Sequence, residues 1–558
     1  MIYSYLFEAK SIQAYLFQSG KLKDVIAASE RLDRMVDTTE SSLVGQVLRA
    51  LSLTHDLTNP AANLGDVDIS FLRCKGGALY AGATNKDHLV QFRQLWTLTI
   101  QQLFPSLVFT DALCSGETLG QAIEQGHKLL AQDRNLPQIT LPYGSAYSAR
   151  EQRSGKVAVP VSSFAKKAGV DSAEMKGLDA DTQLHRQAYG LFELKTVSNL
   201  QDRFTPESLR PRHYPVNLDK DFEFDGTKDI ALIHIDGNGL GLLLRQLKSA
   251  MQGKSDSDYR QAFRQFSDTV NKATELAAQD ATAWLAEQFP DATHTLPMRP
   301  LVLGGDDVTL LCHAKYALRY AETFCRAFKQ HADKELRALS RDYQLSVKLT
   351  ASGGVLFHKA GHPFVQSHHL VESLCAKAKQ LTKSCVPAGQ TGPAALACYR
   401  VSQVILTDLE QAAQQAHRYP LQQGGTINLI EMAYLVDEKE GGVSWQQLRQ
   451  LIALCDKAKG TDAKGFTLSR WRKMASELAA GDFVEAKRIF ERGLEFLKKG
   501  NKAAESEFIE ALANLGLQQK RWYRETREGY AAPLVDLLNL AHFEEEISSW
   551  QHNNGEVL

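Results

Sequence analysis

Three aspartates are the residues of this sequence best placed to carry out a reaction. Asp236 ends an apolar run that begins at Ile230, and Asp306 and Asp307 stand side by side after two glycines. Transfer of a nucleotidyl group by two metal ions requires carboxylates that hold Mg²⁺ or Mn²⁺ roughly 3.5 to 4 Å apart. We therefore predict a catalytic and metal-binding role for these three aspartates, provided that the fold brings them together.

The segments around the aspartates predict the fold that does so. Residues 230–235 are typical of a buried strand, and leucines at helical spacing follow them. Two short strands, 300–303 and 308–312, flank the Gly-Gly-Asp-Asp turn, and helix, strand and helix patterns continue to about residue 383. This order predicts a ferredoxin-like (βαββαβ) palm, in which the first strand lies beside the central hairpin.

Glycines and lysines near the aspartates suit a nucleoside triphosphate. Glycines let a substrate approach the backbone closely, and a helix N-terminus can receive phosphate oxygens. Two lysines one helical turn apart are predicted to reach the triphosphate, although a solvated basic helix face is an equally good interpretation. The predicted nucleotide-binding residues are Gly237, Asn238, Gly239, Gly241, Gly304, Gly305, Lys379 and Lys383.

The N-terminal part repeats the same order of elements without the carboxylates. A strand at 2–7, helices at 11–36, a hairpin at 68–81 and a strand at 107–114 predict a second palm. Its turn reads Cys74-Lys75-Gly76-Gly77 and its first strand runs into Glu8, so we predict that this palm is catalytically silent.

The whole chain is thus predicted to be an α+β protein with two palms, a connector and a C-terminal helical part. The expected boundaries are 1–135 for the first palm, 136–225 for the connector, 226–400 for the catalytic palm and 401–558 for the helical domain. A chain of 558 residues is too long for a single core.

Composition excludes several classes of protein. Lys and Arg number 64 against 65 Asp and Glu, so no global charge draws the chain to nucleic acid or membrane. No apolar stretch is long enough to span a bilayer, and we expect a cytoplasmic protein without a membrane partner. The 8 cysteines include no C-x-x-C pair, which argues against a zinc knuckle.

Four places give the chain a resemblance to a known family. They are residues 20–24 with Ala27-Ala28-Ser29, residues 235–241, the Gly304-Gly305-Asp306-Asp307 turn, and Lys379 with Lys383. In these places the sequence resembles the large, polymerase-like subunit of type III CRISPR effector complexes, which makes cyclic oligoadenylates.

The resemblance implies two palms packed face to face, with ATP in the cleft and metal ligands only in the second palm. It also implies the reaction, in which the 3′-hydroxyl of one ATP attacks the α-phosphate of another and later steps close a ring. The partners that it implies are guide-RNA effector subunits and target RNA, while a homodimer stays open. Many members begin with a nuclease domain built on a His-Asp dyad and carry a zinc knuckle. Here His55-Asp56 lacks the surrounding ligands, so we expect a divergent branch without DNA cleavage.

Two other functions stay open at this stage. One is a non-catalytic nucleotide- or RNA-binding scaffold of a ribonucleoprotein effector. The other is a stand-alone cyclic dinucleotide synthase of the GGDEF type, whose hairpin continues Glu-Phe where this chain has Asp307-Val308.

Overall fold

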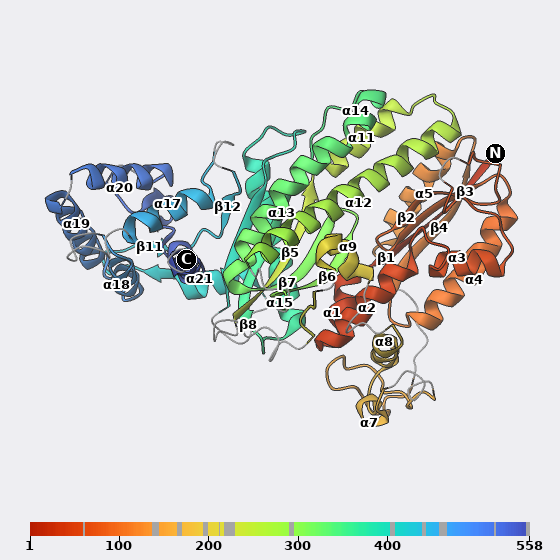
Figure 1. Cartoon of the computed structure of the whole chain (residues 1–558), viewed down its shortest axis with the longest axis horizontal. Coiled ribbons are helices and arrows are strands. Elements are labelled where there is room, and N and C mark those ends of the chain that lie inside the picture. Colours follow the sequence, from red (N-terminus) through yellow and green to blue (C-terminus); the bar gives the residue numbers. More distant parts are fainter. Residues whose placement is uncertain are drawn as a thin grey trace.

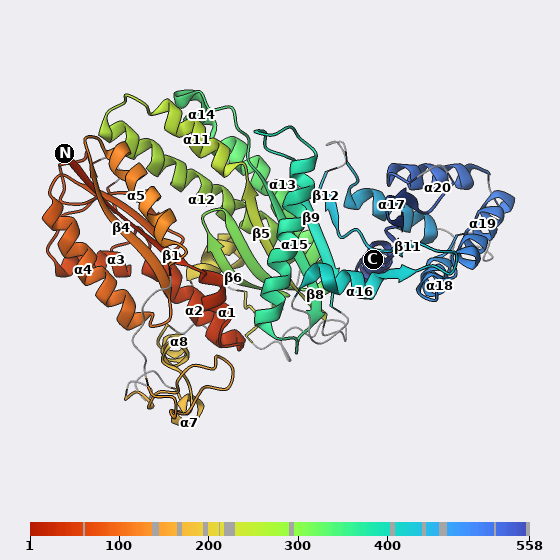
Figure 2. The same cartoon turned by 180° about the vertical axis from the view of Figure 1, so that it is seen from behind.

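A computed structural model gives the fold of the chain. It describes residues 1–59, 62–136, 144–163, 170–192, 199–210, 212–216, 229–288, 295–401, 408–437, 442–456, 466–500, 502–517 and 520–553. The molecule is elongated: an N-terminal sheet lies at one end, a larger sheet in the middle and the C-terminal helices at the other end (Figures 1 and 2).

The first sheet confirms the predicted ferredoxin-like palm. Its strands run in the order β2-β3-β1-β4, and all pairs are antiparallel. The strands are β1 (Ile2–Lys10), β2 (Ser70–Lys75), β3 (Ala78–Ala83) and β4 (Val108–Gly116). The helices are α1 (Ile12–Phe17), α2 (Leu22–Met35), α3 (Leu43–Ala50), α4 (Lys86–Leu103) and α5 (Leu119–Asp133). Alternate strand residues face two cores, since Phe7 belongs to one with α2 and α4, while Leu6 belongs to one with α5.

The second sheet contains the other predicted palm and extends it by two strands. Its order is β12-β9-β8-β5-β7-β6, of which β8-β5-β7-β6 is the ferredoxin-like part. The strands are β5 (Asp229–Asn238), β6 (Met298–Gly304), β7 (Asp307–His313), β8 (Thr350–Lys359), β9 (Ala395–Arg400) and β12 (Ala433–Leu435). The helices are α11 (Leu240–Ala250), α12 (Asp256–Glu287), α13 (Ala314–Glu335), α14 (Arg337–Tyr343) and α15 (Phe364–Ser384).

The two palms share buried surface. One apolar cluster combines Phe7 and Leu79 of the first sheet with Ile230 and Leu356 of the second. Helix α12 covers the opposite face of the second sheet and also contacts β2 and α5 of the first palm. Buried ion pairs reinforce this contact, because Asp56 of the first palm pairs with Arg260 and Arg264 of α12. Asp56 is therefore a structural anchor.

Short helices between the palms pack against both of them: residues 180–191 pack against α2 of the first, and residues 199–204 mainly against α12 and β6 of the second. They are α7 (Ser172–Met175), α8 (Ala180–Leu191), α9 (Asn199–Phe204) and the 3₁₀ helix η1 (Glu207–Leu209). Arg186 of α8 donates to both carboxylate oxygens of Asp24 on α2, at 3.0 and 3.2 Å. Asp24 belongs to the N-terminal stretch that carried the resemblance, and in the fold it holds α8 in place.

The C-terminal part is mostly helical, as predicted, but it also holds a small sheet that the sequence did not predict. The helices are α16 (Leu409–His417), α17 (Trp445–Asp456), α18 (Leu468–Ala479), α19 (Phe483–Gly500), α20 (Lys502–Asn514) and α21 (Leu534–Asn553). The sheet has the order β10-β11-β14-β13. Its strands are β10 (Arg418–Pro420), β11 (Thr426–Asn428), β13 (Arg524–Thr526) and β14 (Gly529–Ala531). Strands of three residues are too short for an alternating pattern to be recognised.

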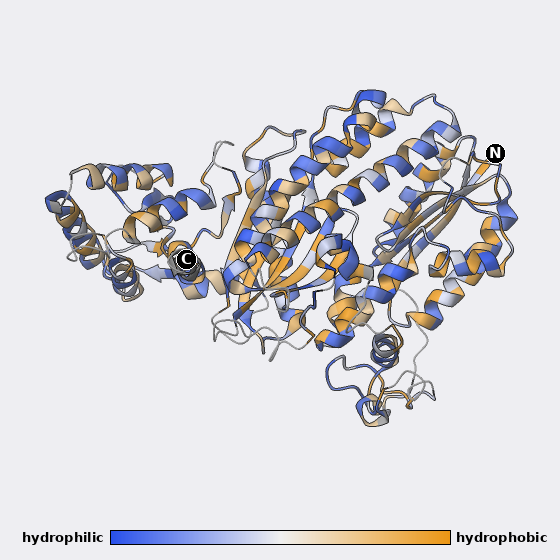
Figure 3. Ribbon diagram, viewed as in Figure 1, coloured by the Kyte–Doolittle hydropathy of each residue, from blue (hydrophilic) through white to orange (hydrophobic). Residues whose placement is uncertain are grey.

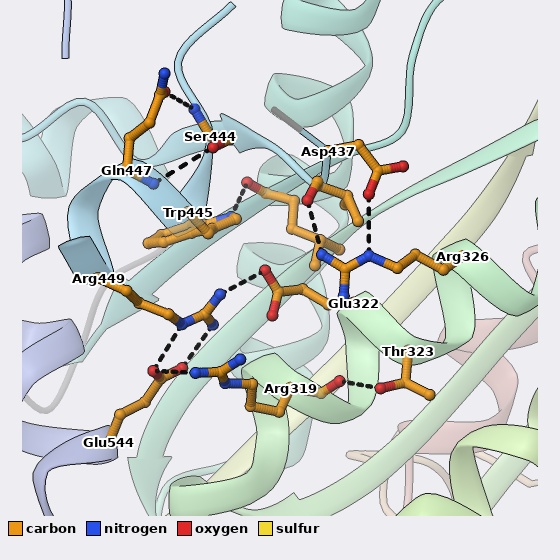
Figure 4. A network of polar contacts seen from close by, with 12 residues as sticks. Arg319, Glu322, Thr323, Arg326, Asp437, Ser444, Trp445, Gln447, Arg449 and Glu544 are labelled. Carbon is orange, nitrogen blue, oxygen red and sulfur yellow. Dashed lines mark hydrogen bonds and ion pairs between the residues drawn. The ribbon is translucent and has the colours of Figure 1, made fainter. Parts of the chain in front are cut away.

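A polar network joins the C-terminal helices to the second palm (Figure 4). Arg449 of α17 lies 2.9 Å from Glu322 of α13 and 2.6 Å from Glu544 of α21. Arg319 adds a second contact to Glu544. Because Arg449 and Glu322 are both buried, removing either side chain would leave the other as an uncompensated charge in the interior.

Hydropathy follows this architecture. The central strands of the second sheet are mainly apolar, whereas the long helices alternate between apolar and polar residues along their length (Figure 3). Within the part of the chain that the structure describes, no helix combines the length and the apolar character that crossing a membrane requires.

Candidate active site

The end of β5 and the β6–β7 turn bring the three aspartates together at one edge of the second sheet. Asp236 is directly paired with Asp307 in the antiparallel ladder, and the backbone N–H of Gly237 donates to the carbonyl of Asp306 at 3.2 Å. The turn is held from α12, where the Thr274 hydroxyl donates to the Gly305 carbonyl at 2.7 Å. The predicted juxtaposition of Asp236 with the hairpin is present.

These carboxylates concentrate negative charge in a partly buried place. Burial, and then the charge of Asp236 and a hydrogen bond with it, raise the pKa of Asp306 to about 7. Burial and the charges of Asp306 and Asp236 likewise raise the pKa of Asp307 to about 7, although a hydrogen bond from Gln13 opposes the shift. Groups so arranged need a proton or a cation between them near neutral pH.

Lys379 supplies one such cation. Its ammonium group, on α15, donates to Asp236 and lies 3.4 Å from the carbonyl oxygen of Gly237. Lys383, one turn further along the helix, is exposed. The structure therefore places the first of the two predicted lysines at the carboxylates and the second at the surface.

The aspartates fit a divalent cation in chemistry, although their present arrangement is not a closed coordination shell. Among the residues that the structure describes, no three His, Cys, Asp or Glu side chains converge closely enough to hold a metal ion. The carboxylates of Asp236 and Asp306 do contact each other, and an oxygen-rich pair of this kind is what Mg²⁺ or Mn²⁺ prefers. Asp236, Asp306 and Asp307 are the residues that would hold such a metal, and a metal there would lower the pKa of a bound hydroxyl and offset negative charge on a phosphate.

The glycine turn after Asp236 has mixed roles. Asn238 is buried and its amide donates to Thr350 and Ser352 of β8, so its side chain supports the sheet. Gly239 is the N-cap of α11 with a φ of 91°, and a Cβ there would lie 2.4 Å from the Thr391 hydroxyl oxygen. Gly241 faces open space and is free to approach a ligand.

Two cavities flank the Gly-Gly-Asp-Asp turn, one on the side of each aspartate. The cavity beside Asp307, here called the Asp307 cavity, has a volume of about 450 Å³. It lies between the turn, α1 and α2 of the first palm, and α15, and its lining includes Gln13, Asp33, Gly76, Gly304, His368 and Glu372. The other, the Asp306 cavity, has a volume of about 500 Å³ and lies between β2, β3 and α5 of the first palm and α11 and α12 of the second. Its lining includes Arg73, Tyr80, His127, Gly241, Arg245, Lys248, Tyr259, Phe263, Gly305 and Asp306.

Both cavities use residues of the first palm that sequence reasoning missed. The Gln13 amide of α1 lies 3.5 Å from a carboxylate oxygen of Asp307, and Arg73 of β2 shares the other cavity with Asp306. Neither residue lies in a recognisable sequence motif. Each reaches the hairpin only because the first palm packs against the second, and no local sequence pattern indicates which residues this packing brings there. Of the predicted glycines, Gly304 lines the first cavity and Gly241 and Gly305 line the second, whereas Gly237 and Gly239 are in neither lining.

The strand order and the hairpin beside β5 define the central part of the chain as a palm domain. Comparison with protein families agrees: residues 229–386 match the family model described as Cas10/Cmr2, second palm domain. Residues 229–386 therefore form a palm of the Cas10/Cmr2 second-palm family.

The solved structures that match include Csm1 and Csm1–Csm4 cassettes. Csm1 in T. onnurineus is 14% identical, with 97% of this chain and 69% of that chain covered and a TM-score of 0.49. A Csm1–Csm4 cassette in complex with cA3 is 12% identical over 93% of this chain and 70% of that chain, with a TM-score of 0.47. A Csm1–Csm4 cassette with one ATP is 13% identical over 97% and 70%, also with a TM-score of 0.47. No curated protein sequence matches this chain.

Proposed function

We propose that the chain is a nucleotidyltransferase that joins ATP molecules into a cyclic oligoadenylate-type second messenger for CRISPR-type antiviral defence. The observation that carries this proposal is the position of Asp236, Asp306 and Asp307 at one sheet edge, with a cavity on either side of the hairpin. Two cavities at one carboxylate site suit a reaction that joins two nucleotides.

In the proposed reaction, the 3′-oxygen of one nucleotide attacks the α-phosphorus of another. A bond from that oxygen to phosphorus forms, the bond to the β-phosphate oxygen breaks with its electron pair, and pyrophosphate leaves while the hydroxyl proton is released. The chain's own residues bind and orient the two nucleotides from both palms. Lys379, now paired with Asp236, is close enough to the turn to bind a phosphate oxygen instead.

Partners follow from the same proposal. We propose that the protein works with guide-RNA effector subunits and that target RNA switches it on. Analysis of the product would then identify the base of the substrate and the number of nucleotides in the ring.

A scaffold that binds nucleotide without turning it over is the second candidate, and one observation favours it. The ion pair between Lys379 and Asp236 neutralises a proposed metal ligand, and no three ligands converge among the described residues. A synthase must open this ion pair when metal and substrate bind, whereas a scaffold can retain it.

Incubation of the purified protein with radiolabelled ATP or GTP and Mg²⁺ or Mn²⁺, with target RNA and effector subunits added, distinguishes the candidates. The wild type is expected to release pyrophosphate and to form a phosphatase-resistant product, and the Asp306→Ala, Asp307→Ala double variant is expected to form none. Asp342→Ala removes an exposed aspartate of α14 and serves as the matched control. Nucleotide binding without product, with target RNA and effector subunits present, would favour the scaffold.

A further inference from the structure

Strand β2 of the first palm contains an irregularity that changes which way its side chains point. In its ladder with β3, Phe71 pairs with Ala81 and Arg73 with Tyr80, so Leu72 has no partner. Neighbouring residues of a regular strand face opposite sides of the sheet. Leu72 and Arg73 nevertheless both line the Asp306 cavity. The bulge therefore turns Arg73 toward the cavity, which is a recognised use of bulges beside functional sites.

The surroundings of Arg73 leave its charge available. Its guanidinium lies 5.7 Å from the centre of the Tyr80 ring, and its charge acts on Glu8 and Asp306 without a direct ion pair among the described residues. A Cβ on Gly76 would lie 3.7 Å from its Nη2 and 3.9 Å from the backbone of Gly304. Arg73 thus stands where the hairpin turns of the two palms meet, on the side of Asp306.

The rest of the cavity is also suited to an anion. Arg245 and Lys248 lie on the exposed side of α11 and, with Arg73, give three cationic side chains in the lining. Asp306 is the single carboxylate among the described lining residues. Tyr259 and Phe263, stacked at 4.5 Å, form an aromatic wall that suits a nucleobase.

We propose that Arg73 of the first palm binds the polyphosphate of a nucleoside triphosphate in the Asp306 cavity, with Arg245 and Lys248 as further phosphate contacts. This inference rests on the proposed function, because it assigns a phosphate-binding residue to the same reaction. A guanidinium offers two parallel N–H donors to phosphate oxygens and stays charged at all working pH values. There it offsets negative charge that gathers on the departing pyrophosphate when the bond from the α-phosphorus breaks.

Binding of inorganic tripolyphosphate without divalent cations, measured by calorimetry, tests the site apart from the reaction. We expect Arg73→Ala and Arg73→Gln to weaken binding roughly 10- to 100-fold, the loss of one charge-assisted contact. Arg73→Gln retains part of the aliphatic side chain near Tyr80. If Arg73→Ala fails to fold, the glutamine variant still tests whether the guanidinium binds phosphate. Arg93→Ala, which removes an arginine paired with Asp111 outside the cavity lining, should bind as the wild type does.

Kinetics with ATP then separate this inference from the proposed function. If the wild type forms product, both Arg73 variants should lose kcat/KM by a similar factor while Arg93→Ala does not. If the wild type forms none with target RNA and effector subunits present, the proposed function fails, and the tripolyphosphate titration alone decides whether Arg73 binds phosphate. A folded Arg73 variant that binds tripolyphosphate like the wild type would overturn the inference, as would a wild type without saturable binding.

Discussion

The two palms of this chain have the same strand order but different residues at the same three positions. In the first palm Glu8 pairs with Ala78, and in the second Asp236 pairs with Asp307. The hairpin ladders match as well, since Lys75 pairs with Ala78 and Gly304 with Asp307. Glu8, Gly77 and Ala78 therefore stand where the second palm has Asp236, Asp306 and Asp307.

The first palm has filled these positions with contacts of its own. Glu8 accepts hydrogen bonds from Tyr80 and from Arg134, the latter at 3.0 Å. Gly77 has a φ of 71°, and a Cβ there would lie 2.5 Å from the Ile12 side chain. The comparison teaches that the palm fold does not depend on its carboxylates. The first palm retains the ferredoxin-like fold, and its residues form part of the lining of both cavities.

The largest expected effect comes from giving the second palm the turn of the first. The double variant Asp306→Gly, Asp307→Ala copies Gly77 and Ala78 and should lower product formation roughly 1,000-fold or more, because the proposed metal ligands are lost. Product yield from radiolabelled ATP is the measurement. The variant should remain folded, since the same residues form a stable turn in the first palm. Near-normal turnover would show that the hairpin carboxylates are not the catalytic ones.

The reverse exchange should damage the fold without creating activity. Gly77→Asp forces a side chain into a left-handed conformation against Ile12, and we expect a loss of roughly 2 to 5 kcal/mol in the free energy of unfolding. Urea denaturation measures the loss. Gly253→Ala is the matched control: it has a φ of 76° but open space around it, so it should cost only about 1–2 kcal/mol. Equal losses in both would mean that Ile12 moves aside.

The sequence predicted those parts of the site that depend on local pattern. The strand before Asp236 and the turn between two short strands are local signals. They were sufficient to predict the order of elements in the palm and the proximity of Asp236 to the hairpin. Arg73 and Gln13 had no such signal, because their place depends on a bulge and on the packing of the first palm. Lys379 lies at the predicted place but contacts Asp236, since an unscreened carboxylate attracts the nearest ammonium group.

A smaller contrast should appear in the dependence of stability on pH without metal. The pKa values of Asp306 and Asp307 are raised to about 7 in the folded protein, above the value of about 4 in an unfolded chain. Their protonated forms therefore favour the folded state at low pH, and this contribution is lost as the pH rises from about 4 through 7. In EDTA, the unfolding temperature of the wild type should fall more between pH 5.5 and 8 than that of Asp306→Asn, Asp307→Asn.

Magnesium provides the check on that interpretation. Added at pH 8, it should restore stability to the wild type by binding the ionised carboxylates, and it should have little effect on the double asparagine variant. Gly77 and Ala78, the counterparts in the first palm, have no ionisable side chains, so the first palm turn should contribute nothing to this pH dependence. If the two proteins show the same pH profile, the shift in stability originates elsewhere in the chain.

The smallest expected effect is at Glu8, the counterpart of Asp236. Burial alone raises the pKa of Glu8, but hydrogen bonds from Tyr80 and Arg134 lower it overall, so the ionised form stabilises the fold. Glu8→Gln should cost about 1 kcal/mol at pH 7, measured by urea denaturation, and the difference from the wild type should shrink as the pH falls through the pKa of Glu8. Product formation should stay within about twofold of the wild type, the scale of a change below 0.5 kcal/mol in the barrier. Asp236→Asn, tested beside it, should abolish product. A large loss of product in Glu8→Gln would mean that the first palm contributes a carboxylate to the reaction, and that the two palms differ less than their turns indicate.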